Sequence, residues 1–180
     1  MSSVLQDVVV WLNSVVIGLN LCPFSGKPTR ENRVRFYISD AGTQEDVLTD
    51  IFSEMELLDK IPASELETTL VIIPHALEDF FDYNQCLAWA QSQLKRRGWL
   101  GVYQLASFHP DYCFAGADPQ DVENLTNRSP YPIIHIIREA SLEKALDFFP
   151  DVEEIPERNK EAVAALTPEQ KRQLFPYLFQ

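Results

Sequence analysis

The side chains best suited to chemistry are concentrated between residues 101 and 139, which hold two of the three histidines, two arginines and a cysteine. Histidine changes charge close to neutral pH, so it is the usual general acid or base. His109 precedes Pro110 at the end of a predicted strand, where catalytic side chains collect in open α/β sheets. His135 lies inside the next predicted strand. We predict catalytic roles for both, with a hydrogen-bonded core histidine as the alternative for His135.

Cys22, in the sequence LCPF at residues 21–24, has three interpretations. As a nucleophile it requires a nearby base or cation that lowers its pKa, a role open to His109 or an arginine. As a metal ligand it would join His109, Cys113 or His135, but the chain has no CxxC or HxxxH spacing. The third interpretation is a plain buried thiol. We therefore expect no metal and no cofactor, and we keep Cys22 as a candidate nucleophile.

The arginines suggest an anion site, because guanidinium groups bind carboxylate or phosphate through two parallel hydrogen bonds. Arg128 lies in NRSPYP at residues 127–132, where two prolines stiffen the backbone as a preorganised binding loop requires. We predict that Arg35, Asn127, Arg128 and Arg138 contact a small anionic molecule. The alternatives are solvated salt bridges to the 27 acidic residues and, for NRSPYP, a structural corner.

Composition limits the classes of protein to consider. A chain of 180 residues with 46% hydrophobic residues is predicted to form a single domain. The net charge of −12 repels phosphate backbones, so we expect no nucleic-acid partner. Three cysteines without paired spacing indicate a reducing compartment, and the N-terminal MSSVLQDVVVW has neither the basic start of a signal peptide nor the length of a membrane span. We expect a cytoplasmic protein that does not bind membranes, of undetermined oligomeric state.

The hydrophobic pattern predicts an α/β fold, with α+β as the alternative. Strand 33–38 alternates, with Arg33, Arg35 and Tyr37 on a polar face. The other predicted elements are helix 4–19, helix 43–60, the fully buried strand 69–73, helix 80–94 ending at Gly98, strands 101–108 and 132–138 with a short helix from Asp118 between them, and three C-terminal helices, the first capped by Ser141 and the last by Thr167. This order implies a four-stranded mixed sheet with helices packed on it, right-handed crossovers between the first three strands, and a helical C-terminus.

Several segments resemble a bacterial family of uncharacterised single-domain proteins, classed as a domain of unknown function. The matching segments include GLNLCPF (18–24), QLASFHPDYCFAG (104–116), NRSPYPIIHIIREAS (127–141) and IPERN (155–159). The resemblance implies that the family's marked polar positions are Cys22, Arg35, His109, Asn127, Arg128, His135 and Arg138. The family usually has glutamine at the position of Cys113, which weakens Cys113 as a ligand, and the helix from Thr167 is expected to be particular to this chain.

Three functions fit these observations. The first is an enzyme, or a binding protein descended from one, that acts on a small anionic metabolite through its histidines, arginines and Cys22. The second is a non-catalytic module that binds or senses such an anion. The third is an interaction domain in which exposed Tyr131, Phe175 and Phe179 contact a partner. The first two require the predicted residues to converge on one pocket.

Overall fold

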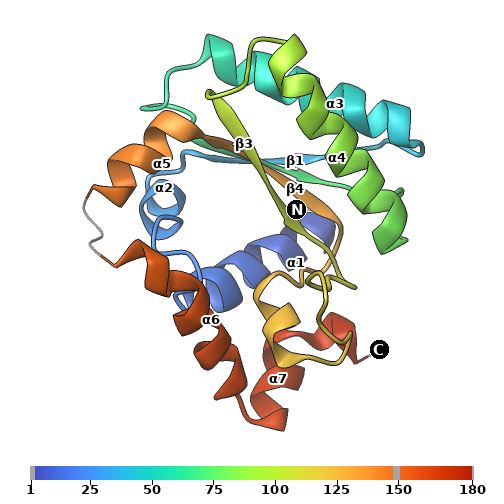
Figure 1. Ribbon diagram of the computed structural model, residues 1–180, viewed down its shortest axis with the longest axis vertical. Helices are drawn as coiled ribbons and strands as arrows, with labels where there is room; N and C mark the ends of the chain where they lie inside the picture. Colours follow the sequence, from blue (N-terminus) through green and yellow to red (C-terminus); the bar gives the residue numbers. More distant parts are fainter. Residues whose placement is uncertain (1–2, 148–150, 180) are drawn as a thin grey trace.

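The computed structural model describes residues 3–147 and 151–179, and its sheet lies between two groups of helices (Figure 1). The elements are α1 (Ser3–Trp11), the π-helix η1 (Leu12–Ile17), α2 (Gly26–Arg30), β1 (Val34–Ile38), α3 (Gln44–Lys60), β2 (Thr68–Ile72), α4 (Phe80–Arg96), β3 (Tyr103–Phe108), the 3₁₀-helix η2 (Val122–Thr126), β4 (Ile133–Arg138), α5 (Glu139–Leu146), η3 (Val152–Glu154), α6 (Ile155–Ala164), α7 (Pro168–Leu174) and η4 (Pro176–Leu178).

The predicted four-stranded mixed sheet is confirmed, in the order β1-β2-β4-β3. Strands β1 and β2 run parallel, and β4 is antiparallel to both of its neighbours, β2 and β3. The first three strands therefore share one direction, but β4 is inserted between β2 and β3. Strand β2 is buried along its whole length, as its continuous apolar sequence predicts.

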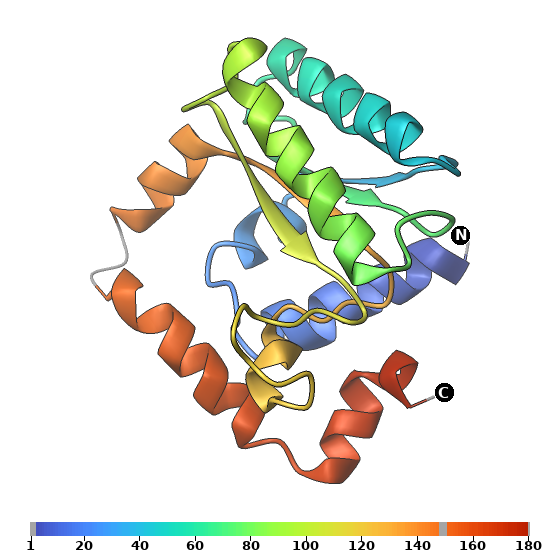
Figure 2. The same cartoon turned by 45° about the vertical axis from the view of Figure 1, so that its right-hand side comes forward.

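Each strand contributes to two separate cores, because successive side chains point to opposite faces of a sheet. Val71 and Ile134 pack with the inner sides of α3 and α4. Leu70 and Ile133 pack with α1, η1 and the C-terminal segment around Phe175. Figure 2 shows α3 and α4 on one side of the sheet and α1, α6 and α7 on the other. We call these the α3/α4 side and the α1 side.

Three helix ends lie where the sequence predicts them. Thr43 caps α3 by accepting a hydrogen bond from the backbone of Asp46, and Thr167 forms the predicted capping box of α7. After α4, Gly98 adopts a φ of +77°, and Trp99 N–H donates to the carbonyl of Leu94. Glycine is favoured there because a side chain is strained in this left-handed conformation.

The first predicted helix ends at Gly18 as expected, but it is α-helical only to Trp11 and continues as the π-helix η1, and after it Leu21 N–H donates to the carbonyl of Val16, five residues earlier. Two other boundary predictions are wrong. Asp118 opens a hydrogen-bonded turn with Asp121, so the short helix begins only afterwards, at residue 122. Ser141 caps nothing, because β4 runs directly into α5 two residues earlier.

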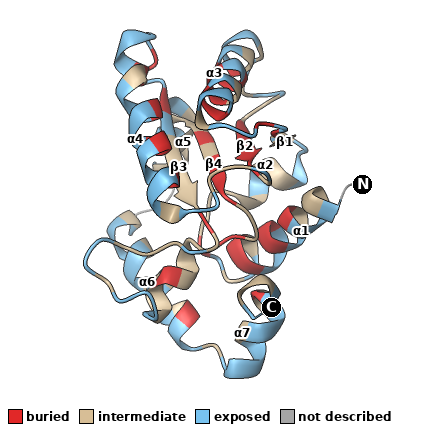
Figure 3. Ribbon diagram, turned by 90° about the vertical axis from the view of Figure 1, so that its right-hand side faces the viewer, coloured by how far each residue is buried: buried red, intermediate tan, exposed pale blue. Residues whose placement is uncertain are grey.

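Burial is uneven over the chain (Figure 3). Buried residues concentrate in β2, β4 and the sheet-facing sides of α1 and α3, whereas α6 and α7 are mostly exposed. None of the described helices is long and apolar enough to cross a bilayer.

Candidate functional site

The structure does not bring the predicted site residues together in one pocket. By the strand register, His135 shares the α1 side with Leu70, and Cys22 packs against the same core. Arg35 and Arg138 alternate onto the α3/α4 side. His109 contacts α4 at the end of β3. The hypothesis of a single site built from all these residues therefore has no geometric support.

His109 is fully buried and bonded to backbone through both ring nitrogens. Its Nε2 lies 3.0 Å from the carbonyl of Leu77, and its Nδ1 accepts from the N–H of Asp111 at 3.0 Å. A carbonyl only accepts, so Nε2 carries the proton and the imidazole is neutral. The ring also packs between Phe80 and Tyr83, and burial lowers its pKa. This environment is that of a structural histidine and leaves no nitrogen for a substrate.

Arg138 caps the C-terminal end of α3 instead of facing a ligand site. Its Nη2 donates to the carbonyls of Leu58 and Ile61 at 2.6 Å and of Leu66 at 3.2 Å. The last carbonyls of a helix have no partner within the helix and carry partial negative charge, so a cation there is doubly favourable. Arg138 thereby joins β4 to α3 and to the loop that leads into β2.

Arg35 is engaged by a buried carboxylate. Its Nε and Nη2 donate to the two oxygens of Glu54 at 2.7 and 3.1 Å, which is the bidentate geometry expected of the pair. Glu54 is only 4% exposed, so Arg35 is needed to compensate its charge. The polar face of β1 therefore packs against the acidic residues of α3, and the Tyr37 hydroxyl donates a single hydrogen bond to Asp50 at 3.0 Å.

Asn127 and Arg128 organise the long connector between β3 and β4. Asn127 Nδ2 donates to the carbonyl of Ser107 on β3, which lies at the edge of the sheet. Arg128 donates from Nε to the carbonyl of Tyr112 at 3.3 Å and from Nη2 to the carbonyl of Pro119 at 2.9 Å. Its own carbonyl accepts from Trp11 Nε1 at 3.0 Å. In this structure NRSPYP is the structural corner that the sequence left open as an alternative.

His135 differs from His109, because one of its ring nitrogens has no hydrogen bond to any residue that the structure describes. Thr68 Oγ1 lies 2.5 Å from the carbonyl of Ile136 and 2.6 Å from His135 Nε2. The single hydroxyl proton must go to the carbonyl, so Nε2 donates to Thr68 and Nδ1 carries the lone pair. Within the described residues, Thr69 Oγ1 is the one fully buried side-chain nitrogen or oxygen without a hydrogen bond. Nδ1 of His135 is not among these fully buried atoms, and the residue as a whole is partly exposed.

Burial lowers the pKa of His135 to about 4, so the imidazole is neutral at pH 7. Of the two strand positions paired with it, Leu70 on β2 is buried, whereas Ala106 on the edge strand β3 is only partly buried. His135 thus presents an unprotonated nitrogen on a face that the helices cover incompletely.

Cys22 lies in the loop after η1 and is partly buried. Burial raises the pKa of its thiol, against the opposing effect of hydrogen bonds from Phe24 and Ser25. The neutral thiol is the favoured form at pH 7, and it is the weakly nucleophilic one. No histidine or arginine is recorded beside it within the described residues.

Sequence reasoning missed Arg158 and Asn159, although both lie in the IPERN segment used for the resemblance. Asn159 Nδ2 donates to the carbonyl of Leu21 at 2.7 Å, which fastens α6 beside Cys22. Arg158 is partly buried, precedes Asn159 by one residue, and has no hydrogen bond or ion pair to any described residue. A partly buried arginine without a carboxylate partner is unexpected in a chain with 27 acids and 15 bases.

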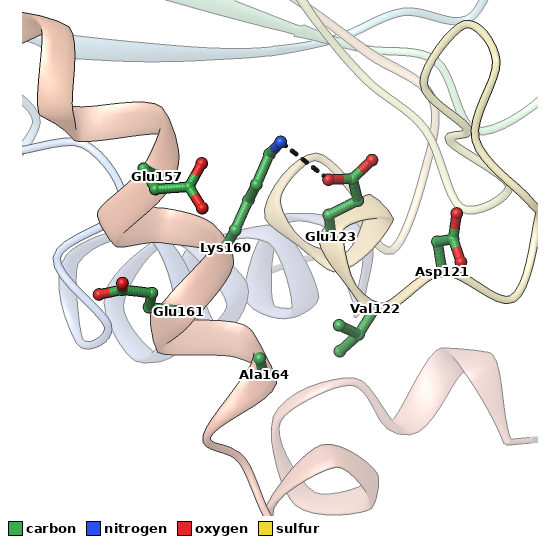
Figure 4. A pocket seen from close by; sticks show the side chains of 7 residues that line it. All are labelled: Asp121, Val122, Glu123, Glu157, Lys160, Glu161 and Ala164. Atoms are coloured by element: carbon green, nitrogen blue, oxygen red, sulfur yellow. Dashed lines mark ion pairs between the residues drawn. The ribbon is translucent and has the colours of Figure 1, made fainter.

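A hollow of about 400 Å³ lies between η2 and α6 (Figure 4). Its lining is mainly acidic and consists of Asp121, Val122, Glu123, Glu157, Lys160, Glu161 and Ala164. Lys160 pairs with Glu123 at 3.0 Å. None of the predicted site residues lines it.

The aromatic residues predicted as partner contacts are not equivalent. Phe175 is fully buried in the α1-side core, so the prediction that it is exposed is wrong. Tyr131 is partly buried and its hydroxyl donates to Asp7 at 2.9 Å, whereas Phe179 is 55% exposed.

Taken together, the fold and these contacts define an α/β protein with one mixed sheet, in which most of the marked polar residues stabilise the architecture. The chain belongs to the DUF1415 family, described as a protein of unknown function, whose model matches residues 3–173. The match includes most of α7, so the prediction that this helix is particular to the chain is wrong. No curated protein and no solved structure matches the chain.

Proposed function

We propose that this protein binds a small anionic molecule on the α1 side of its sheet, with His135 as the group that accepts a proton or hydrogen bond from it. The observation that carries the proposal is Nδ1 of His135, which has no hydrogen bond to any described residue. Thr68 fixes the other ring nitrogen, so the lone pair on Nδ1 has a defined direction before any ligand arrives. Preorganisation of this kind is what binding and general-base sites require.

The low pKa of His135 supports an anionic ligand in particular. Without a ligand the imidazole is a weak base, because burial penalises its protonated form. A carboxylate or phosphate bound nearby would favour the protonated form and raise the pKa towards neutrality. The ligand would therefore strengthen the base that acts on it. A hydroxyl or N–H on the same ligand would supply the proton that Nδ1 accepts.

Arg158 is the candidate anion contact. The four residues predicted for this role, Arg35, Asn127, Arg128 and Arg138, are hydrogen-bonded to other parts of the protein. It shares one side of α6 with Ala162, which packs against the α1-side core. The bond from Asn159 to the carbonyl of Leu21 connects α6 to the loop that holds Cys22, and we assign the partly buried Cys22 to the wall of the site and not to a nucleophilic role. The π-helix η1 immediately before it adds support, since π-helical turns occur frequently at functional sites.

The test is a thermal-shift series with inorganic phosphate, glycerol 3-phosphate, succinate and malate. Malate differs from succinate by one hydroxyl, so a larger shift with malate would report the hydrogen bond to Nδ1. A ligand at a hundred times its Kd stabilises by about 2.7 kcal/mol, which corresponds to a rise in Tm of roughly 5 to 10 °C for a protein of this size.

Arg158→Gln is expected to abolish the shift, and Arg172→Gln, which removes an exposed arginine on α7, is expected to retain it. His135→Gln is expected to remove the difference between malate and succinate. An equal shift in Arg158→Gln and the wild type, or no saturable shift with any of the four anions, would refute the proposal.

A further inference from the structure

A second hollow, of about 330 Å³, lies on the α3/α4 side, across the sheet from His135. Its lining is contributed by two helices and the residue that follows α4, and consists of Gln44, Glu45, Leu48, Thr49, Phe52, Trp89 and Arg97. This volume is within the range of small-ligand sites. The hollow shares no residue with the site proposed above.

The floor of this hollow is apolar and aromatic. Leu48 and Phe52 are 7% and 6% exposed, so they form a firm base one turn apart on α3. Trp89 stands beside them at 48% exposure, with its ring centroid 6.2 Å from that of Phe52. A tryptophan half-exposed next to a hollow offers a large, rigid contact surface at low entropic cost.

The two ends of the hollow carry opposite charges. The Arg97 guanidinium lies 3.9 Å from the centre of the Phe52 ring, which fixes its position without using its N–H groups. Its side chain has no hydrogen bond or ion pair to any described residue. Glu45 lies in the first turn of α3, seven residues before Phe52. At 1.5 Å per residue, the backbone positions of Glu45 and of Phe52, on which Arg97 lies, are about 10 Å apart along the helix axis.

We propose that this hollow binds a short apolar peptide with free termini. Its carboxylate would pair with Arg97, its ammonium with Glu45, and its side chains would pack on Trp89. An extended chain spans about 3.3 to 3.6 Å per residue, so a separation near 10 Å fits a tripeptide. A single amino acid fits poorly, because its two charges are adjacent.

The test titrates the protein with leucyl-phenylalanyl-leucine and follows tryptophan fluorescence. Trp11 and Trp99 are 3% and 6% exposed, so Trp89 dominates any change on binding. The same tripeptide with an acetylated N-terminus and an amidated C-terminus is the ligand control. Saturable binding of the free tripeptide is expected at concentrations up to about 1 mM, and binding of the blocked form at least tenfold weaker.

Arg97→Gln is expected to weaken binding at least tenfold, whereas Arg96→Gln, at the neighbouring exposed position, leaves it unchanged. Equal binding of the free and blocked peptides, an unaffected Arg97→Gln, or no saturable change in fluorescence would each overturn the inference. None of these results bears on the anion proposal, because the ligands and variants are different.

Discussion

Replacement of His109 by alanine is expected to lower the free energy of unfolding by about 3 to 5 kcal/mol. The ring is fully buried between Phe80 and Tyr83, so its loss leaves a cavity. It also leaves the carbonyl of Leu77 and the N–H of Asp111 without their bonds. Leu77 has a φ of +58°, which is unusual for a residue with a side chain, and His109 helps to hold it there. Urea denaturation measures the effect.

The loss in the free energy of unfolding caused by His109→Ala should also depend on pH. Burial depresses the pKa of His109 below its ordinary value of 6.5 in the folded protein. The unfolded chain therefore binds the proton first as pH falls, and the wild type loses this part of its stability below about pH 6.5. The difference in the free energy of unfolding between the wild type and His109→Ala should therefore become smaller at acidic pH. The control is His75→Ala, at an exposed histidine, and a loss in His109→Ala no larger than in this control would contradict a structural role.

Replacement of Arg138 by alanine is expected to cost about 2 to 4 kcal/mol, because three backbone carbonyls lose one donor group together. Two of them, on Leu58 and Ile61, belong to the end of α3 and its cap. Removal of Arg138 also removes the cation that opposes the negative end of the helix dipole. Hydrogen exchange should show that the last turn of α3 is deprotected first.

Arg138→Lys separates charge from geometry. Lysine keeps the positive charge but has no planar fork, so it cannot reach the three carbonyls in the same arrangement. We expect it to recover less than half of the stability lost in Arg138→Ala. Full recovery by lysine would show that charge alone matters, and an alanine variant as stable as the wild type would refute the capping role.

The sequence predicts the fold well because the relevant signals are local. Alternation in residues 33–38 and the unbroken apolar run at 69–73 define the strand surfaces directly. Thr43, Gly98 and Thr167 mark helix ends through contacts with residues only a few positions away. Insertion of β4 between β2 and β3 depends on long-range pairing, and no local pattern encodes it.

The candidate site was harder to predict, because the same residue types serve structure and function. His109 lies at the end of a strand as a catalytic residue often does, but α4 and the carbonyl of Leu77, 32 residues earlier, bury it. The role of Arg138 depends on the end of α3, up to 80 residues away. The interior strand position of His135 left both a catalytic and a core role open, and among the described residues only its Nε2 has a hydrogen-bond partner. Arg158 had one available signal, its place in the IPERN segment.

The central claim is that His135 is a neutral base whose Nδ1 is open to a small anion, and ring-nitrogen NMR titration tests it most directly. Without ligand, the account predicts the tautomer with the proton on Nε2 and protonation near pH 4. With saturating malate, it predicts a clear rise in the pKa of His135. The His135→Gln variant identifies which NMR signals belong to His135, and the Arg158→Gln variant is expected to show no such rise. Protonation near the ordinary value of 6.5 without ligand, or a proton on Nδ1, would contradict the account.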